Sequence, residues 1–170
     1  MTFGDFDKGF EGESVADEGA PFDAGGEELT GPPRSLDFEP HREPHRAIIL
    51  DDNPEVARQL KVVAERLLTG WVLELFTDLP QAIQALIHGR FDALLTDFNL
   101  KKGETSEPLI RVALDHGISS SHMVVWTGNA LDAQGVMPAS VSVYQKPDVE
   151  ALKNALVTIR QLVEGRIGEA

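Results

Sequence analysis

The segment FDALLTD, residues 91–97, is a short apolar run that ends on an aspartate. Apart from Asp92 and Thr96, the residues before that aspartate are hydrophobic, as expected of a central strand that is covered on both faces. Three similar runs also end on a polar or charged side chain: IILDD at 48–52, MVVWT at 123–127 and VSVYQK at 141–146. Because parallel strands direct their carboxyl ends toward one crevice, we expect these final side chains to meet there.

Apolar runs of strand length alternate with segments of helical period five times from residue 46 onward, which is the pattern of successive βα units. The predicted strands are 46–50, 71–76, 91–96, 122–126 and 140–145. The predicted helices are 53–70, 78–89, 106–117 and 149–163, with room for only a short helix between 127 and 140. Glu74 in the second run suggests an edge strand. Right-handed crossovers would build a doubly wound α/β fold with a parallel sheet.

The first 45 residues differ in composition from the rest of the chain. They contain 12 Asp and Glu against 3 Lys and Arg, and no apolar periodicity, so they cannot bury enough apolar surface to offset the entropy lost on ordering. We predict a disordered acidic tail at 1–45, a folded domain at 46–165 and a short C-terminal tail at 166–170. The acidic tail is either a solubilising segment or a docking motif, because it contains five of the eight phenylalanines: Phe3, Phe6, Phe10, Phe22 and Phe38.

The charge and composition of the chain exclude several classes of function. A net charge of -13 argues against binding to nucleic acid or to an anionic membrane, since both require clustered Lys and Arg. The chain has no cysteine, which excludes disulfides and thiol nucleophiles and favours a reducing cytoplasm. No run approaches the roughly 18 apolar residues of a membrane span, and the first residues carry acids and glycines where a secretory signal would need a basic start and an apolar stretch. We therefore expect a soluble cytoplasmic protein.

Asp51, Asp52 and Asp97 would bring three carboxylates to one crevice. At about 4 Å and an effective dielectric constant near 20, each pair of like charges costs on the order of 4 kcal/mol, so cations are required. Lys146 supplies one, and hard oxygen ligands favour Mg²⁺, held by Asp52 and Asp97 with Asp51 acting directly or through water. A carboxylate beside such an ion can attack phosphorus. Asp97 fits the nucleophile, Thr127 a hydroxyl donor to the phosphoryl oxygens, and Lys146 a positively charged clamp.

Residues 46–163 resemble the CheY-like receiver domain of bacterial response regulators. ILDDN closes the first predicted strand, LLTDFNL contains the phosphoacceptor-like Asp97, WTG presents Thr127 and QKP presents Lys146. The resemblance implies a flavodoxin-like sheet of five parallel strands in the order 2-1-3-4-5. It also implies a stand-alone response regulator in a two-component phosphorelay, which is a signalling module and not an enzyme.

The same resemblance implies partners and a ligand set. The phosphoryl donor would be a phosphohistidine on a sensor histidine kinase or a histidine phosphotransfer protein, and the output would pass through contacts with an unknown protein target. Asn99 would lend its backbone carbonyl to Mg²⁺, beside Asp51, Asp52 and Asp97. The Lys146–Pro147 bond would be cis.

Two features depart from the pattern of the family. Receivers usually place an aromatic switch residue three positions before the conserved lysine, where this chain has Val143. The aromatic residue here is Tyr144, which should face the other side of the strand. The stretch from Thr127 to Lys146 is also about one helical turn shorter than usual, which truncates the fourth helix.

Two alternative functions remain open. A pseudo-receiver that binds a partner without being phosphorylated would account for the altered switch position, although the acidic set is complete. A small Mg²⁺-dependent phosphatase of the haloacid dehalogenase kind also uses an aspartyl nucleophile. That family requires an Asp-x-Asp motif, whereas Asn99 stands two residues after Asp97.

Overall fold

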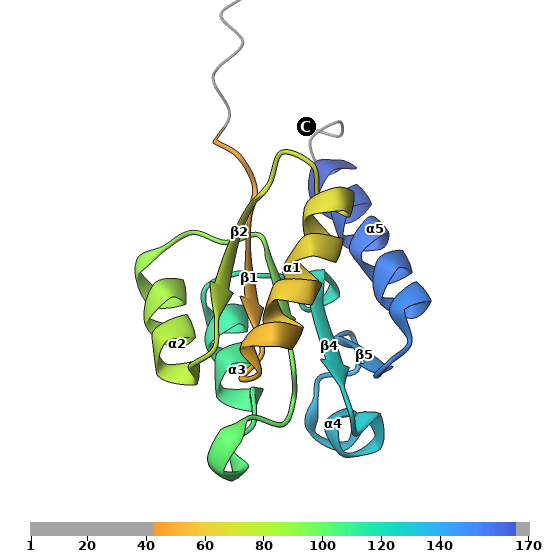
Figure 1. The fold of residues 1–170 in the computed structure, drawn as a ribbon. Coiled ribbons are helices and arrows are strands. Elements are labelled where there is room, and N and C mark those ends of the chain that lie inside the picture. Colours follow the sequence, from red (N-terminus) through yellow and green to blue (C-terminus); the bar gives the residue numbers. More distant parts are fainter. Residues whose placement is uncertain (1–42, 166–170) are drawn as a thin grey trace, which may run out of the picture. The chain divides into compact units, whose positions relative to one another are not determined.

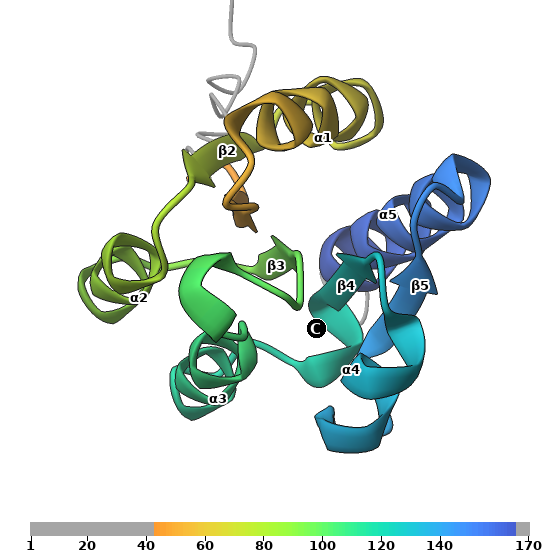
Figure 2. The same cartoon turned by 60° about the horizontal axis from the view of Figure 1, so that its bottom comes forward.

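The computed structural model describes residues 43–165, which form one α/β domain with helices on both faces of a central sheet (Figures 1 and 2). The sheet contains five strands in the order β2-β1-β3-β4-β5, and every neighbouring pair is parallel. The predicted doubly wound fold and its strand order are thus confirmed. The tails predicted at 1–45 and 166–170, including the five phenylalanines, lie outside the described residues except for residues 43–45.

Every predicted strand and helix is present, with boundaries shifted by a few residues. The strands are β1 (Arg46–Leu50), β2 (Val72–Phe76), β3 (Ala93–Thr96), β4 (Met123–Thr127) and β5 (Ser142–Gln145). The helices are α1 (Pro54–Leu67), α2 (Leu79–His88), α3 (Glu107–Asp115), α4 (Ala130–Val136) and α5 (Val149–Gly165). Two single-turn 3-10 helices occupy Lys101–Gly103 and Ser120–His122. Among the described residues, no helix combines the length and apolarity needed to cross a membrane.

Local hydrogen bonds explain where the elements begin. Asn53 Oδ1 accepts from Glu55 N at 3.0 Å, which caps α1 ahead of Pro54 in its first turn. The Asp78 carboxylate caps α2 in a similar way, since its Oδ1 accepts from Gln81 N at 3.1 Å. Strand β3 begins two residues later than predicted, at Ala93; just before it, Asp92 N donates to Arg46 O at 2.8 Å and the Asp92 carboxylate accepts from Arg46 N at 2.9 Å.

The sheet separates two hydrophobic clusters. Alternate residues of the central strands point to opposite faces, so Ile48 and Leu94 pack toward α2 and α3, while Ile49 and Leu95 pack toward α1 and α5. This two-sided burial is why the runs are apolar throughout. The strand β2 lies at an edge of the sheet, as Glu74 predicted.

The two departures from the family pattern are present in the structure. Val143 packs with the cluster on the α3 and α4 side, whereas Tyr144 packs with the cluster on the α1 and α5 side. The helix α4 is only 7 residues long, which confirms the short connection before β5. The surface that α4 and β5 form is therefore small and has no aromatic switch on its face of the sheet.

Alanine substitutions at two glycines, one crowded and one in open space, should change the free energy of unfolding in opposite directions. A Cβ added at Gly89 would lie 2.8 Å from the Phe91 ring and 2.9 Å from Ala85 O, whereas one added at the exposed Gly135 in α4 would meet nothing within 4 Å. We expect Gly89→Ala to lower the free energy of unfolding by about 1–3 kcal/mol because the backbone must shift. Gly135→Ala should raise it by up to about 1 kcal/mol because alanine favours the helix. Urea denaturation measures both changes, and equal stability of the two variants would contradict this packing.

Candidate functional site

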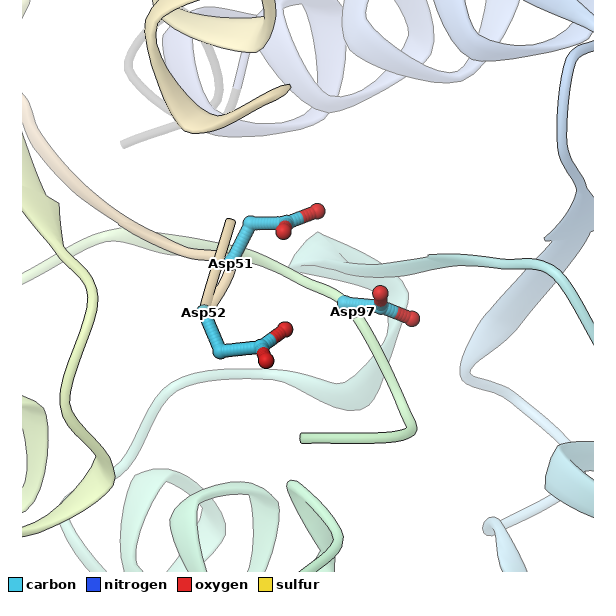
Figure 3. Close-up of side chains that lie close together, drawn as sticks. All are labelled: Asp51, Asp52 and Asp97. Carbon is cyan, nitrogen blue, oxygen red and sulfur yellow. The ribbon is translucent and has the colours of Figure 1, made fainter. Parts of the chain in front are cut away.

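Three aspartates lie together at the carboxyl end of the sheet (Figure 3). Asp51 and Asp52 follow β1, and Asp97 follows the neighbouring strand β3, where Asp97 N donates to Leu50 O at 2.9 Å. One carboxylate oxygen from each aspartate lies within 4.8 Å of the others. Asp51 and Asp97 are buried, and Asp52 is half-buried. The convergence predicted from the strand ends is therefore present.

Lys146 brings a positive charge into this cluster from the end of β5. Its Nζ donates to Asp51 Oδ2 at 2.9 Å and to Asp97 Oδ2 at 2.8 Å. The same Nζ lies 5.3 Å from the centroid of the Trp126 ring, within the range of a cation–π contact. One ammonium thus joins two carboxylates, and the four charged side chains together retain an excess of negative charge. The Lys146–Pro147 bond is cis, as the resemblance implied.

Burial and pairing act in opposite directions on these groups. Burial raises the pKa of the Asp51 carboxyl above 3.8, although the hydrogen bonds from Lys146 and from Asn53 N lower it. Burial by itself lowers the pKa of Lys146, but its hydrogen bonds to Asp97 and Asp51 outweigh that effect and raise the pKa above 10.5. The ammonium is therefore charged at neutral pH, and the folded protein ionises Asp51 at a cost.

One carboxylate oxygen of Asp97 has no hydrogen-bond partner in the part of the chain that the structure describes. Asp97 Oδ1 is buried, and within residues 43–165 no group donates to it, whereas Oδ2 accepts from Lys146. A buried acceptor without a donor is costly, and coordination to a cation would remove that cost. The surrounding carboxylate oxygens are hard ligands of the kind that Mg²⁺ prefers. The residues present therefore fit a magnesium ion.

The remaining predicted site residues lie at the end of β4 and in the loop after Asp97. Thr127 is fully buried at the end of β4, and its carbonyl accepts from Lys146 N at 2.8 Å. Asn99 is exposed in the loop after Asp97, where it forms a single antiparallel bridge with Thr105. The role of the Asn99 carbonyl as a metal ligand stays a prediction, as do the chemical roles of the other site residues.

Sequence reasoning missed Gln145, which precedes Lys146. Its side-chain amide donates to Gly128 O at 2.6 Å and accepts from Ala130 N at 2.9 Å. The only signal in the sequence was its position two residues after Val143, on the same face of β5. A polar side chain at an exposed strand end gives no indication from sequence alone that it binds a particular loop.

Asp51→Asn should reduce the loss of stability that the metal-free protein undergoes as the pH rises from 3.8 toward 7, because the amide does not ionise. A raised carboxyl pKa means that the folded protein binds the proton more tightly, so the wild type loses stability as the pH rises from 3.8 through the folded value. The stability of Asp51→Asn relative to the wild type should therefore increase from pH 3.8, below which the carboxyl is protonated in both states, toward neutral pH.

Thermal unfolding in a chelator, followed from acid to neutral pH, measures this difference. Asp115→Asn is the matched control, since Asp115 is exposed at the end of α3. A stability difference between Asp51→Asn and the wild type that stays constant from acid to neutral pH would contradict the assignment of a burial cost to this carboxylate.

No family model matches the chain, and no curated protein matches its sequence. Its fold does match solved structures. A response regulator receiver protein from Sinorhizobium medicae has a TM-score of 0.60 at 18% identity, over 73% of this chain and 98% of that one. A CheY-like receiver domain protein from Methanospirillum hungatei has a TM-score of 0.58 at 21% identity, over 75% of this chain and 100% of that one.

A de novo designed protein with a Rossmann 2x3 fold is also similar. Its TM-score is 0.51 at 20% identity, over 71% of this chain and 90% of that one. A designed fold therefore gives a match as well, so a function has to be argued from the side chains at the site. What the comparisons establish is the architecture: the described part of this chain has the fold of the CheY-like receiver domains of response regulators.

Proposed function

We propose that this chain is a response regulator that accepts a phosphoryl group on Asp97 and signals through protein contacts. The observation that carries the proposal is the environment of Asp97. One of its carboxylate oxygens is held by Lys146 at 2.8 Å, and the other is buried with no donor in residues 43–165. An oriented, incompletely satisfied carboxylate beside a fixed cation has the properties of a nucleophile for phosphoryl transfer.

The proposed donor is a phosphohistidine on a sensor histidine kinase or a histidine phosphotransfer protein. As an Asp97 oxygen forms its bond to phosphorus, the phosphorus–nitrogen bond breaks and its electron pair returns to the imidazole ring. Lys146 stabilises the negative charge on the phosphoryl oxygens, and the Thr127 hydroxyl donates to one of them. Asp51, Asp52, Asp97 and the Asn99 carbonyl would hold Mg²⁺, which supplies further positive charge when it is bound.

The proposed role is that of a cytoplasmic signalling module and not of an enzyme that turns over a separate substrate. The excess of acidic residues, 28 Asp and Glu against 15 Lys and Arg, favours protein partners over nucleic acid or anionic membranes. A haloacid dehalogenase reaction would need a second acid two residues after the nucleophile, where this chain has Asn99. The residues of this site do not identify the protein that receives the signal.

Incubation of the protein with Mg²⁺ and a small acyl phosphate should add about 80 Da, the mass of one phosphoryl group, as measured by intact mass spectrometry. Asp97→Asn should abolish the adduct because the amide is not a nucleophile. Asp115→Asn, an exposed control, should leave it unchanged. Absence of an adduct on the wild type would favour a binding module, and rapid release of phosphate from monoesters would favour a phosphatase.

Magnesium should bind with a dissociation constant that depends on Asp52. This residue makes no hydrogen bond within residues 43–165, so Asp52→Asn removes a charged ligand and little else. We expect the affinity for Mg²⁺ to fall about tenfold or more, by isothermal titration calorimetry, because loss of one carboxylate ligand weakens binding of a hard cation. Equal affinities of the wild type and Asp52→Asn would mean that the three-carboxylate cluster does not hold the ion.

A further inference from the structure

The side chain of Gln145 joins the end of β5 to the loop that leads from β4 into α4. Its Nε2 donates to Gly128 O at 2.6 Å, and its Oε1 accepts from Ala130 N at 2.9 Å. The opposite orientation of the amide would place oxygen against a carbonyl and nitrogen against an N–H, so the two backbone partners fix the orientation. One side chain therefore restrains both sides of Asn129.

A backbone hydrogen bond joins the same two segments next to the site. Thr127 and Gln145 are opposite each other in the parallel ladder between β4 and β5, and Lys146 N donates to Thr127 O at 2.8 Å. Thr127 and Lys146 are the pair that would contact a phosphoryl group. Gly128 directly follows Thr127, Gln145 directly precedes Lys146, and the Gln145 side chain bonds to Gly128 O. A movement of either strand end is passed to the loop at 128–130 through these bonds.

The face of β5 on which Gln145 lies makes this connection unusual. Gln145 and Val143 are two residues apart and share the face that packs toward α4, whereas Tyr144 faces α5. Val143 occupies the position of the aromatic switch residue but has no aromatic ring that could change its position when Thr127 moves. Among the described residues on this face of β5, Gln145 is the side chain that bonds to the β4–α4 loop.

We propose that Gln145 is a positioning residue that couples the phosphoacceptor site to α4; this inference rests on the proposed function of Asp97. When Thr127 and Lys146 move toward a phosphoryl group, the amide of Gln145 carries the loop at 128–130 with them. Helix α4 begins at Ala130, so its first turn moves as well. That helix has two exposed apolar side chains, Leu131 and Val136. Their position relative to a partner then depends on whether Asp97 is phosphorylated.

Amide NMR of the full chain, with and without Mg²⁺ and beryllium fluoride as a phosphoryl mimic, tests this coupling. In the wild type we expect resonances to shift both at the site and along Ala130–Val136. In Gln145→Ala the shifts at Asp51, Asp52 and Asp97 should persist, while those of α4 should fall about fivefold, the scale of losing ordinary hydrogen bonds. The Ala130 amide, which loses its acceptor, should also exchange with solvent about fivefold faster in the variant without ligand.

Two further variants separate hydrogen bonding from packing and from unrelated surface effects. Gln145→Met keeps the length of the side chain without its amide and should behave like Gln145→Ala. Gln161→Ala is the control, because Gln161 is exposed on α5 and makes no side-chain hydrogen bond within residues 43–165. A normal α4 response in Gln145→Met or in Gln145→Ala overturns the coupling role and leaves the proposed function standing. Absence of any response in the wild type overturns the proposed function and the coupling together.

Discussion

The ammonium of Lys146 holds together a site that would otherwise repel itself. Three carboxylates lie within 4.8 Å of one another, and Lys146 Nζ contacts two of them, at 2.9 and 2.8 Å. Its backbone N–H also bonds to Thr127 O, so the residue that supplies the charge fixes the neighbouring strand end as well. The parallel sheet makes this possible, because β1, β3, β4 and β5 all direct their carboxyl ends to the same edge. Among the described residues, Asp97 Oδ1 is a buried carboxylate oxygen without a hydrogen-bond donor, and it lies where the proposed chemistry occurs.

Most of the architecture was predictable because it depends on patterns of a few residues. The alternation of apolar runs and helical periods placed every strand and helix, and Asn53 and Asp78 marked the starts of two helices. The meeting of Asp51 with Asp97 followed from one rule about parallel strands. The opposite orientations of Val143 and Tyr144 followed from the two-residue period of a strand.

Other features could not be predicted because they depend on distances between side chains far apart in the sequence. The unsatisfied oxygen of Asp97 results from the position of Lys146, 49 residues away, which reaches only one of the two oxygens. The bonds of Gln145 depend on the path of the loop at 128–130, which no periodic pattern fixes. The start of β3 also differs from the prediction, next to Asp92, whose side chain and backbone both bond to Arg46.

The indole of Trp126 gives this molecule an optical property tied to its chemistry. Its ring centroid lies 5.3 Å from Lys146 Nζ, so the excited state of the ring experiences the field of the ammonium directly. The second tryptophan, Trp71, donates a hydrogen bond from its Nε1 to Glu164 in the last turn of α5. A displacement of the ammonium toward a new anion should therefore change the fluorescence emission of Trp126.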